Sequence, residues 1–388
     1  MKGPSTEVIH RGEGGSRTAE PLTLPIYETT TFLFESAAEV RAQAEGRSDK
    51  FLYSRYANPT VQAVEEKLAQ VERAEAAVLM GSGMAATATT LMALLSAGDE
   101  VVCSSAIYGG TLRLLADVLP RFGVASRFVR PDDLTDATVL VGPRTKVVWF
   151  ESPINPTLRC VDVAAVARIC REAGVVSILD NTFATPVNQQ PIALGVDLVM
   201  HSATKYLNGH SDVTAGVVAG SGALVGQVWA MRKVLGSVLD PQAAYALGRG
   251  LKTLAVRVAR HNENAMVVAR WLQSDRRVAR VFYPGLESHP DHKVALRQMS
   301  GFGGMVCLEL DGGLERASRM FDRLQVFQRA ASLGGVESLC SLPVLTSHWG
   351  HSEERLRQAG VTAGMVRLSV GLEDVEDLIA DLDQALEG

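Results

Sequence analysis

Short runs of almost wholly apolar residues recur along the first 240 residues, and amphipathic stretches separate them. The apolar runs predict strands over residues 76–80, 100–103, 124–129, 146–151, 175–180 and 198–201. The amphipathic stretches predict helices over residues 61–73, 111–121 and 163–173, and over a stretch that follows Gly83 and ends at residue 95. Apolar strands that alternate with helices are typical of a parallel sheet covered on both faces. This region is therefore predicted to have an α/β fold.

The pattern changes on the N-terminal side of the α/β domain, which is expected to span residues 58–242. Residues 1–57 show no regular period and are interrupted by glycine and proline. They nevertheless carry apolar side chains such as Ile26, Tyr27 and Phe32, which are unusual for a disordered tail. The segment is predicted to be an arm that contacts a neighbouring subunit.

The pattern changes again near residue 240. Apolar positions 247, 251, 254 and 258 recur at helical spacing and predict one long helix that bridges two domains and runs past residue 271. Strand-like runs over 305–310 and 366–370 are mixed with a predicted helix over 376–386. Residues 243–388 are therefore expected to form a smaller α+β domain.

Composition narrows the classes of function. With 388 residues, 47% of them hydrophobic and 21% charged, the chain is typical of a well-buried globular protein. A net charge of −5 provides no basic field for nucleic acid or an anionic membrane surface. No apolar stretch approaches the roughly 20 residues that a membrane span needs, and residues 1–25 lack the apolar core of a secretory signal. Five scattered cysteines without a C-x-x-C pair fit reduced thiols, so a cytoplasmic protein is expected.

A lysine shortly after the predicted strand 198–201 is the first candidate for chemistry. Lys205 has hydroxyl side chains close by in the sequence, Ser202 and Thr204. This arrangement suits a Schiff base to an aldehyde cofactor whose phosphate the hydroxyls bind. Asp180 ends the preceding strand, and a carboxylate there can keep a pyridine nitrogen protonated, so that the ring accepts electrons. Sites of this kind lie at the ends of strands in doubly wound sheets.

A glycine-rich turn, Gly81-Ser82-Gly83, lies between a predicted strand and a predicted helix. Glycines at a helix N-terminus let backbone N–H groups approach a phosphate. The turn also satisfies the loose dinucleotide pattern G-x-G-x-x-A, which leaves a dinucleotide-dependent oxidoreductase as an alternative. That pattern expects an acidic residue after the next strand, where this chain has Ser104 and Ser105. A cradle for a single phosphate is therefore favoured.

Longer motifs are distributed along the chain: Tyr53-Ser54-Arg55, Asn58-Pro59-Thr60, Tyr108-Gly109-Gly110-Thr111, Glu151-Ser152-Pro153, Asn155-Pro156, Asp180-Asn181-Thr182, Ser332-Leu333-Gly334-Gly335 and Arg367-Leu368-Ser369-Val370-Gly371. Together they resemble the Cys/Met-metabolism (trans-sulfuration) family of pyridoxal-phosphate enzymes, the group of cystathionine γ-lyase and cystathionine γ-synthase. The resemblance extends from residue 25 to the C-terminus. It implies pyridoxal 5'-phosphate as cofactor and the aspartate-aminotransferase-like fold (fold type I), with a mostly parallel sheet in the large domain.

The resemblance also implies roles for individual residues. Lys205 would hold the cofactor as a Schiff base and move protons, Asp180 would contact the ring nitrogen, and Tyr108 would stack on the ring as an acid–base partner. The cofactor phosphate would be bound by Gly83, Met84, Ser202 and Thr204, and by Tyr53 and Arg55 of the neighbouring subunit. Each site would then need a dimer, and the expected assembly is a homotetramer of two active dimers.

Further residues resemble those that bind the amino-acid substrate. Arg367 would clamp the α-carboxylate, a bidentate task that suits guanidinium, with help from Asn155 and Ser332. Glu337 resembles a glutamate that faces the distal part of cystathionine, and the segment 108–113, including Arg113 as a substrate-binding residue, also resembles the cystathionine-handling members. These matches imply γ-elimination or γ-replacement on sulfur amino acids, with a cystathionine γ-lyase that releases cysteine, 2-oxobutanoate and ammonia as the first hypothesis.

Other hypotheses stay open on particular residues. Leu52 stands where cystathionine enzymes commonly have an acidic residue, which favours a smaller or less polar substrate such as methionine, whereas methionine γ-lyases often have a cysteine in place of Gly110. Segments 346–348 and 352–360 resemble the homoserine sulfhydrylases, so replacement by such an enzyme or by a cystathionine γ-synthase is an alternative. A catalytically idle homologue is disfavoured because Lys205 is retained. His348-Trp349-Gly350-His351 lacks a third metal ligand, so no metal site is predicted.

Overall fold

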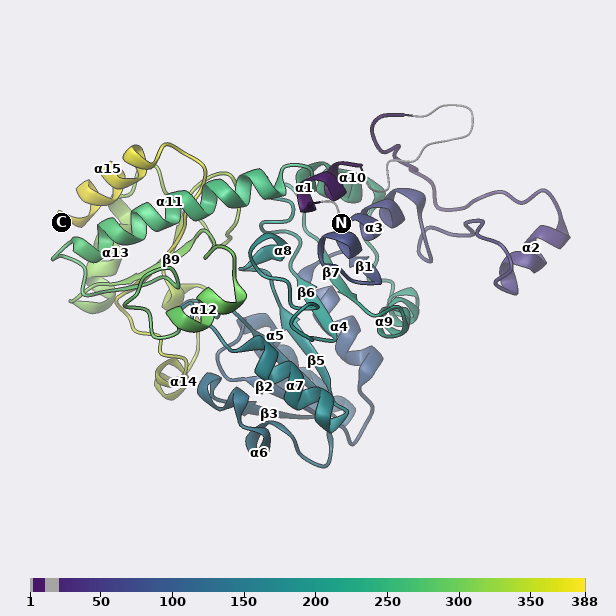
Figure 1. The fold of residues 1–388 in the computed structure, drawn as a ribbon, viewed down its shortest axis with the longest axis horizontal. Coiled ribbons are helices and arrows are strands. Elements are labelled where there is room, and N and C mark those ends of the chain that lie inside the picture. The colour runs from purple at the N-terminus through teal and green to yellow at the C-terminus, as the bar shows by residue number, and fades with distance from the viewer. Residues whose placement is uncertain (1–2, 11–20, 388) are drawn as a thin grey trace.

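The computed structural model describes residues 3–10 and 21–387. Within these ranges, a seven-stranded sheet forms the centre of the larger part of the molecule, in the order β1-β7-β6-β5-β4-β2-β3 (Figure 1). The strands are β1 (Ala76–Met80), β2 (Glu100–Ser104), β3 (Ala125–Val129), β4 (Thr145–Glu151), β5 (Val176–Asp180), β6 (Leu198–His201) and β7 (Gly216–Gly220). Strands β2 to β6 are parallel, whereas β7 lies antiparallel between β1 and β6. The predicted α/β fold with a mostly parallel sheet is confirmed.

Both faces of this sheet are covered, because its strands are apolar on both sides. In β4, Val147 and Trp149 belong to one apolar cluster, and Val148 and Phe150 belong to another. Helices α4 (Gly83–Leu94), α5 (Gly109–Arg113) and α9 (Gly222–Leu235) complete the first cluster. Helices α6 (Ala137–Leu140) and α7 (Val163–Ala173) complete the second. At the β1 edge, α1 (Pro4–His10), α3 (Pro59–Val71) and α10 (Pro241–Leu251) pack together.

A second, smaller sheet lies in the C-terminal part, in the order β10-β11-β12-β9-β8. Its strands are β8 (Arg280–Phe282), β9 (Met305–Glu309), β10 (Gln328–Arg329), β11 (Leu339–Ser341) and β12 (Met365–Ser369). The helices of this part are α11 (Leu254–Ser274), α12 (His292–Gln298), α13 (Gly313–Arg323), α14 (Glu353–Gln358) and α15 (Val375–Leu386), and α8 (Thr185–Asn188) contacts α11 from the larger part. The exact domain boundaries at residues 57 and 242 stay predictions.

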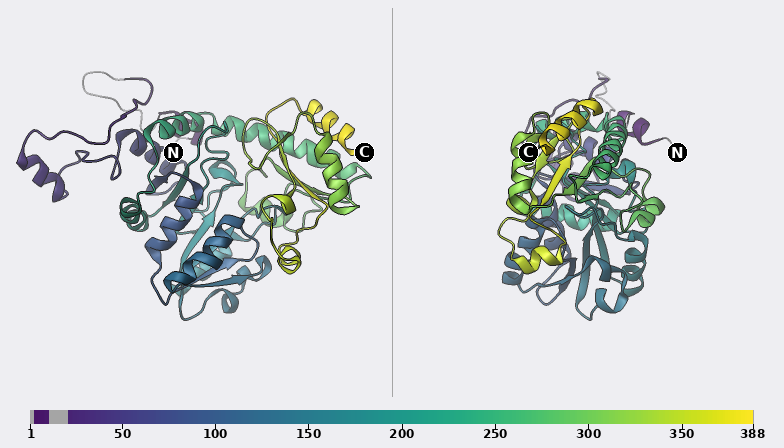
Figure 2. Two further views of the ribbon diagram at one scale, coloured as in Figure 1. Left: turned by 180° about the vertical axis from the view of Figure 1, so that it is seen from behind. Right: turned by 90° about the vertical axis from the view of Figure 1, so that its left-hand side faces the viewer.

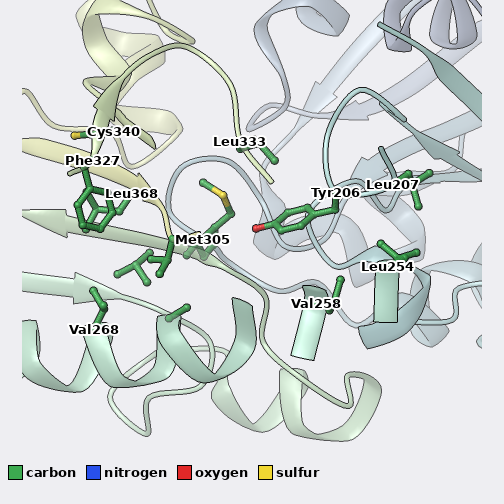
Figure 3. Packing of buried hydrophobic residues seen from close by; sticks show 14 of the residues in the cluster. Tyr206, Leu207, Leu254, Val258, Val268, Met305, Phe327, Leu333, Cys340 and Leu368 are labelled. Carbon is green, nitrogen blue, oxygen red and sulfur yellow. The ribbon is translucent and has the colours of Figure 1, made fainter. Parts of the chain in front are cut away.

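A continuous apolar cluster joins the two sheets beneath the candidate site. Figure 3 shows Tyr206, from the turn after β6, between Leu254 of α11 and Met305 of β9. All three side chains are at most 2% exposed. Because Tyr206 follows Lys205 directly, this packing fixes the turn that carries the candidate catalytic lysine.

Within the N-terminal arm, α1 packs against α3, whereas the part around α2 (Ala37–Ala44) leads away from the rest of the chain (Figure 1). Figures 1 and 2 show α2 near the far end of this part, before the chain returns to α3. Leu22 and Leu33 on this arm are 89% and 94% exposed. Exposed apolar side chains on an ordered segment agree with the expected contact to a neighbouring subunit, which stays a prediction. None of the helices within the described ranges is both long and apolar enough to cross a membrane.

The prediction of one long bridging helix is wrong, because α10 and α11 are separated by two residues. The break between α10 and α11 depends on contacts with segments that are distant in the sequence. The Arg257 guanidinium donates to the carbonyl oxygens of Gly250 at 2.8 Å and of Tyr206 at 2.7 Å. A Cβ on Gly250 would lie only 2.3 Å from the carbonyl oxygen of Asn208, so the end of α10 presses against the turn that follows Lys205.

The helix predicted over 111–121 also differs from the structure. It is divided into α5, one wider turn over Leu114–Val118 and one tighter turn over Leu119–Phe122. Pro120 has no backbone N–H to donate to a carbonyl oxygen of the preceding turn, which accounts for the irregular end. Strand β7 and helix α9 were not predicted.

Candidate active site

A cavity of about 260 Å³ lies where the carboxyl ends of the parallel strands meet. Most of the predicted site residues line it together, although they come from distant parts of the sequence: Gly83, Met84, Tyr108, Asn155, Asp180, Ser202, Thr204 and Lys205. Asp180 ends β5, Ser202 directly follows β6, and Gly83 begins α4. The topology thus brings these groups to the edge of the sheet where ligands bind in doubly wound folds.

Lys205 is held on the turn after β6 with its amine in the cavity. Its backbone N–H donates to the carbonyl of Ser202, and its Nζ donates to Ser332 Oγ at 2.8 Å. Burial lowers the pKa of Lys205 below its ordinary value, and the positive charge of Arg367 acts in the same direction. A lowered pKa leaves more of the amine neutral and therefore nucleophilic near neutral pH.

The N-terminus of α4 forms the other wall. Ser82 caps this helix by accepting from Ala85 N at 3.0 Å, and the first N–H groups of an α-helix have no intrahelical partner. A Cβ on Gly83 would lie 3.0 Å from both Cβ and Oγ of Ser202, so glycine permits this close approach. The Thr204 hydroxyl donates to and accepts from the backbone of Ala215. The wall therefore offers the helix N-terminus and the Ser202 hydroxyl to an anion.

Two carboxyl groups meet at the strand ends on another side of the cavity. Asp180 Oδ1 accepts from the Thr182 N–H at 3.0 Å and from the Thr182 hydroxyl at 2.5 Å. Burial raises the pKa of Asp180, while the hydrogen bonds from Thr182 and the charge of His201 oppose the shift. Burial and the nearby Asp180 charge raise the pKa of Glu151 well above its usual range. Asp180, which Thr182 holds in place, is therefore the carboxyl group better suited to a cationic ring.

The guanidinium of Arg367 is buried without an acidic partner in the part of the chain that the structure describes. Its side chain is 6% exposed, Nη1 donates to Asn155 Oδ1 at 3.0 Å, and Nη2 donates to the Ser332 carbonyl at 3.1 Å. The Nε atom is buried and has no hydrogen-bond partner. Burial lowers the pKa of Arg367 because it removes the charge from water. A buried cation with an unused donor creates a strong preference for a carboxylate.

Comparison with known proteins identifies the family. Residues 5–387 match the family described as Cys/Met metabolism PLP-dependent enzyme. The chain belongs to this family. Its members include an L-methionine γ-lyase of Pseudomonas putida, which is 42% identical over 389 residues, or 100% of this chain and 98% of that protein. They also include a chloroplastic cystathionine γ-synthase of Arabidopsis thaliana, which is 41% identical over 98% of this chain and 68% of that protein.

Solved structures agree with the family assignment. The crystal structure of cystathionine γ-lyase from Lactobacillus plantarum complexed with L-serine superposes with a TM-score of 0.94 at 37% identity, covering 100% of this chain and 99% of the other. The predicted family, fold and pyridoxal-phosphate dependence are thereby confirmed. This Cys/Met-metabolism enzyme is a carbon–sulfur lyase or a closely related enzyme that acts by γ-elimination or γ-replacement. The alternative of a dinucleotide-dependent oxidoreductase is excluded.

The side chains of the cavity fit pyridoxal phosphate. The α4 N-terminus, which Gly83 allows to approach Ser202, suits a phosphate group. At the β5 end, Asp180 is held by Thr182 and offers a carboxylate to a ring nitrogen. Lys205 offers an amine with a lowered pKa for the aldehyde. Donors for a phosphate, a carboxylate for a pyridinium and an amine for an aldehyde are the three groups that this cofactor requires.

Some predicted residues of the family enzyme lie outside the cavity of their own chain. The Arg55 guanidinium donates to the Lys233 carbonyl at 2.5 Å and lies 5.5 Å from the Tyr53 ring centroid. Glu337 accepts from the Ser211 hydroxyl, and Arg113 is exposed at the end of α5. The roles assigned to these side chains stay predictions.

Other cavity residues received no role from the sequence. Among them are Glu151, Thr182, Phe183, Met200, Thr214 and Leu333. Glu151 could have been found by the same signal as Asp180, because both are carboxylates that end an apolar strand. Thr182 follows Asp180 by two residues, a spacing at which a hydroxyl or N–H often bonds back to a carboxylate.

Proposed function

We propose that this enzyme is a cystathionine γ-lyase, which cleaves cystathionine to cysteine, 2-oxobutanoate and ammonia. The observation that carries the choice of substrate is the space around Gly110. A Cβ at this position would lie 2.6 Å from Cε1 of Tyr108 and 2.8 Å from Sδ of Met84. The Tyr108 ring therefore occupies the space in which a cysteine, common in methionine γ-lyases, would stand. This packing supports the cystathionine reading over the methionine reading.

In the proposed mechanism the cofactor supplies an aldehyde carbon for the substrate amino group and an electron-accepting ring. Asp180 would hold the ring nitrogen in its protonated form, and Thr182 holds Asp180 in position. Lys205 Nζ removes the α-proton and then moves protons between the α-, β- and γ-carbons as the sulfur leaves. A lowered pKa suits Lys205 to this work, because the amine must be neutral to accept a proton.

The remaining side chains orient the substrate. Arg367 and Asn155 bind the α-carboxylate, and the unused Nε of Arg367 supplies a further donor. Ser332 Oγ accepts from Lys205 Nζ and so keeps the amine near the α-carbon. Tyr108 would stack on the cofactor ring and protonate the leaving sulfur; it lines the cavity and is 48% exposed in the single chain.

Methionine γ-lyase activity is the second candidate, and Leu52 favours it. Leu52 is apolar and 37% exposed on the arm, immediately before Tyr53. An apolar side chain suits the methyl group of methionine better than the charged distal end of cystathionine. The L-methionine γ-lyase of Pseudomonas putida is also 42% identical to this chain.

The discriminating experiment measures 2-oxobutanoate from L-cystathionine and from L-methionine with the purified holoenzyme. The expected result is a kcat/KM for cystathionine at least tenfold above that for methionine, and Lys205→Ala is the inactive control. A preference for methionine would contradict the proposal. Turnover only when an O-acylhomoserine and a thiol are supplied together would instead make the enzyme a cystathionine γ-synthase or a sulfhydrylase.

We propose that two chains share each site in a cytoplasmic homotetramer of active dimers. The N-terminal arm would carry Tyr53 and Arg55 to the cofactor phosphate of the neighbouring chain. Mixing the variants Arg55→Ala and Lys205→Ala tests this sharing. If subunits exchange, a mixed dimer contains one site free of both substitutions, so activity should rise above that of either variant alone. Activity that stays at the sum of the separate variants, with exchange shown by mass spectrometry, would contradict the shared site.

A further inference from the structure

A second, smaller cavity lies behind the segment that carries Tyr108. Its volume is about 130 Å³, well above the roughly 10–15 Å³ that a single water needs. Ile107 and Leu112 line this cavity, whereas Tyr108 and Thr111 line the first one. The two cavities therefore lie on opposite sides of the same short segment.

The C-terminal wall of the second cavity carries cationic and imidazole groups. It includes His348, His351 and Arg355, from α14 and the loop before it. The two imidazole rings lie 5.2 Å apart. Arg355 and Arg113 make no ion pair with any acidic side chain of residues 3–10 and 21–387. Burial lowers the pKa of His351, and so do the charges of Arg355 on this wall and of Arg113 at the end of α5, so positive charge is in excess near the cavity.

Unused polar groups face this cavity from both walls. His348 is 3% exposed, and its Nδ1 shares a hydrogen bond of 2.9 Å with Ser347 Oγ. Its Nε2 has no hydrogen-bond partner among the described residues. On the opposite wall, Ser105 follows β2, and its hydroxyl is buried without a hydrogen-bond partner among the described residues. A buried hydroxyl is usually paired, so that of Ser105 indicates a missing ligand or water.

We propose that this cavity binds a tetrahedral oxyanion of the sulfate or phosphate class. Donors approach from opposite sides, Ser105 from the large sheet and the imidazole–guanidinium group from the C-terminal part. A planar carboxylate satisfies donors in one plane, whereas a tetrahedral anion accepts them from several directions. None of the residues that line the cavity is acidic. The bound anion would join the loop around His348 to the segment that carries Tyr108, and the inference does not depend on which substrate the enzyme cleaves.

The test is calorimetric titration of the holoenzyme with sodium sulfate at constant ionic strength, with chloride replaced in proportion. The holoenzyme keeps its own phosphate cradle filled, so inorganic anions do not report that cradle. Saturable binding of one anion per chain is expected. Arg355→Gln should weaken it at least tenfold, whereas Arg357→Gln should change it less than twofold. Arg357 is the matched control, because it lies on the same helix, carries the same charge and is paired with Glu354.

His351→Gln provides a second variant if Arg355→Gln does not fold, and the same weakening is expected. Three results would overturn the proposal: no saturable binding, equal weakening by Arg355→Gln and Arg357→Gln, or binding that is lost in Arg367→Gln and kept in Arg355→Gln. The last result would place the anion in the substrate cavity.

Discussion

Removal of one hydroxyl, in Thr182→Val, tests whether Asp180 is the carboxylate that binds the cofactor ring. The Thr182 hydroxyl donates to Asp180 Oδ1 at 2.5 Å and accepts from the Ser202 N–H at 2.8 Å. Valine has nearly the same shape but can do neither. A hydrogen bond to a charged group contributes about 1.5–3 kcal/mol. Without it the pKa of Asp180 rises further, so the ionised carboxylate is less available to a pyridinium.

The expected loss follows from that energy. Since 1.4 kcal/mol corresponds to a factor of ten, the affinity of the apoenzyme for pyridoxal phosphate should fall about ten- to hundredfold. The affinity is measured by titrating the apoenzyme and following the absorbance of the bound cofactor. Thr87→Val is the matched control, because Thr87 also lines the cavity but its hydroxyl bonds to the Gly83 carbonyl at 3.1 Å. Equal affinities for the two variants would refute the role assigned to Asp180.

Three further predictions concern the same cavity. Gly110→Cys must displace the Tyr108 ring, and overpacking of this kind costs about 1–3 kcal/mol. The kcat/KM for cystathionine should therefore fall relative to that for methionine by the corresponding factor. Steady-state kinetics on both substrates check this. The rate at which the apoenzyme captures pyridoxal phosphate should rise with pH through the lowered pKa of Lys205, as stopped-flow absorbance would show. Arg367→Gln should move the midpoint of this pH dependence to higher pH, because it removes one cause of the lowered pKa. Arg55→Ala should weaken cofactor retention on dialysis at least tenfold, although Arg55 lies outside the cavity of its own chain, and unchanged retention would argue against a shared site.

The sequence predicts the central sheet well, because buried parallel strands are apolar on both sides. Each of the six predicted runs overlaps an observed strand, and the β6 range agrees residue for residue. Asp180 and Lys205 could be predicted as candidate site residues, because a charged residue at or shortly after the end of a buried apolar strand rarely has a purely structural role. Strand β7 was missed because its sequence, Gly216-Val217-Val218-Ala219-Gly220, is bounded by glycines, which are depleted in strands and weaken the pattern. Its antiparallel direction is set by neighbouring strands and has no local signal.

Tertiary contacts decide the features that the sequence could not predict. The break between α10 and α11 depends on Arg257, which binds carbonyl groups of two separate segments. Apolar periodicity reports which face of a helix is buried and contains no information on such a contact. Likewise, Glu337 contacts Ser211, 126 residues away, and the motif around it does not indicate this partner.

The charges of the cavity explain why a lysine is the group at its centre. Arg367 brings a positive charge to one end, and Asp180 with Glu151 brings carboxyl groups to the other. In the proposed site, an amino acid would bind with its carboxylate toward Arg367, and a protonated ring nitrogen would lie near Asp180. Burial, and after it the positive charge of Arg367, lower the pKa of Lys205. The guanidinium that we propose to orient the substrate therefore also favours the neutral form of the lysine, which can take a proton. A substitution at Arg367 should consequently impair substrate binding and proton removal together, which a KM effect alone would not reproduce.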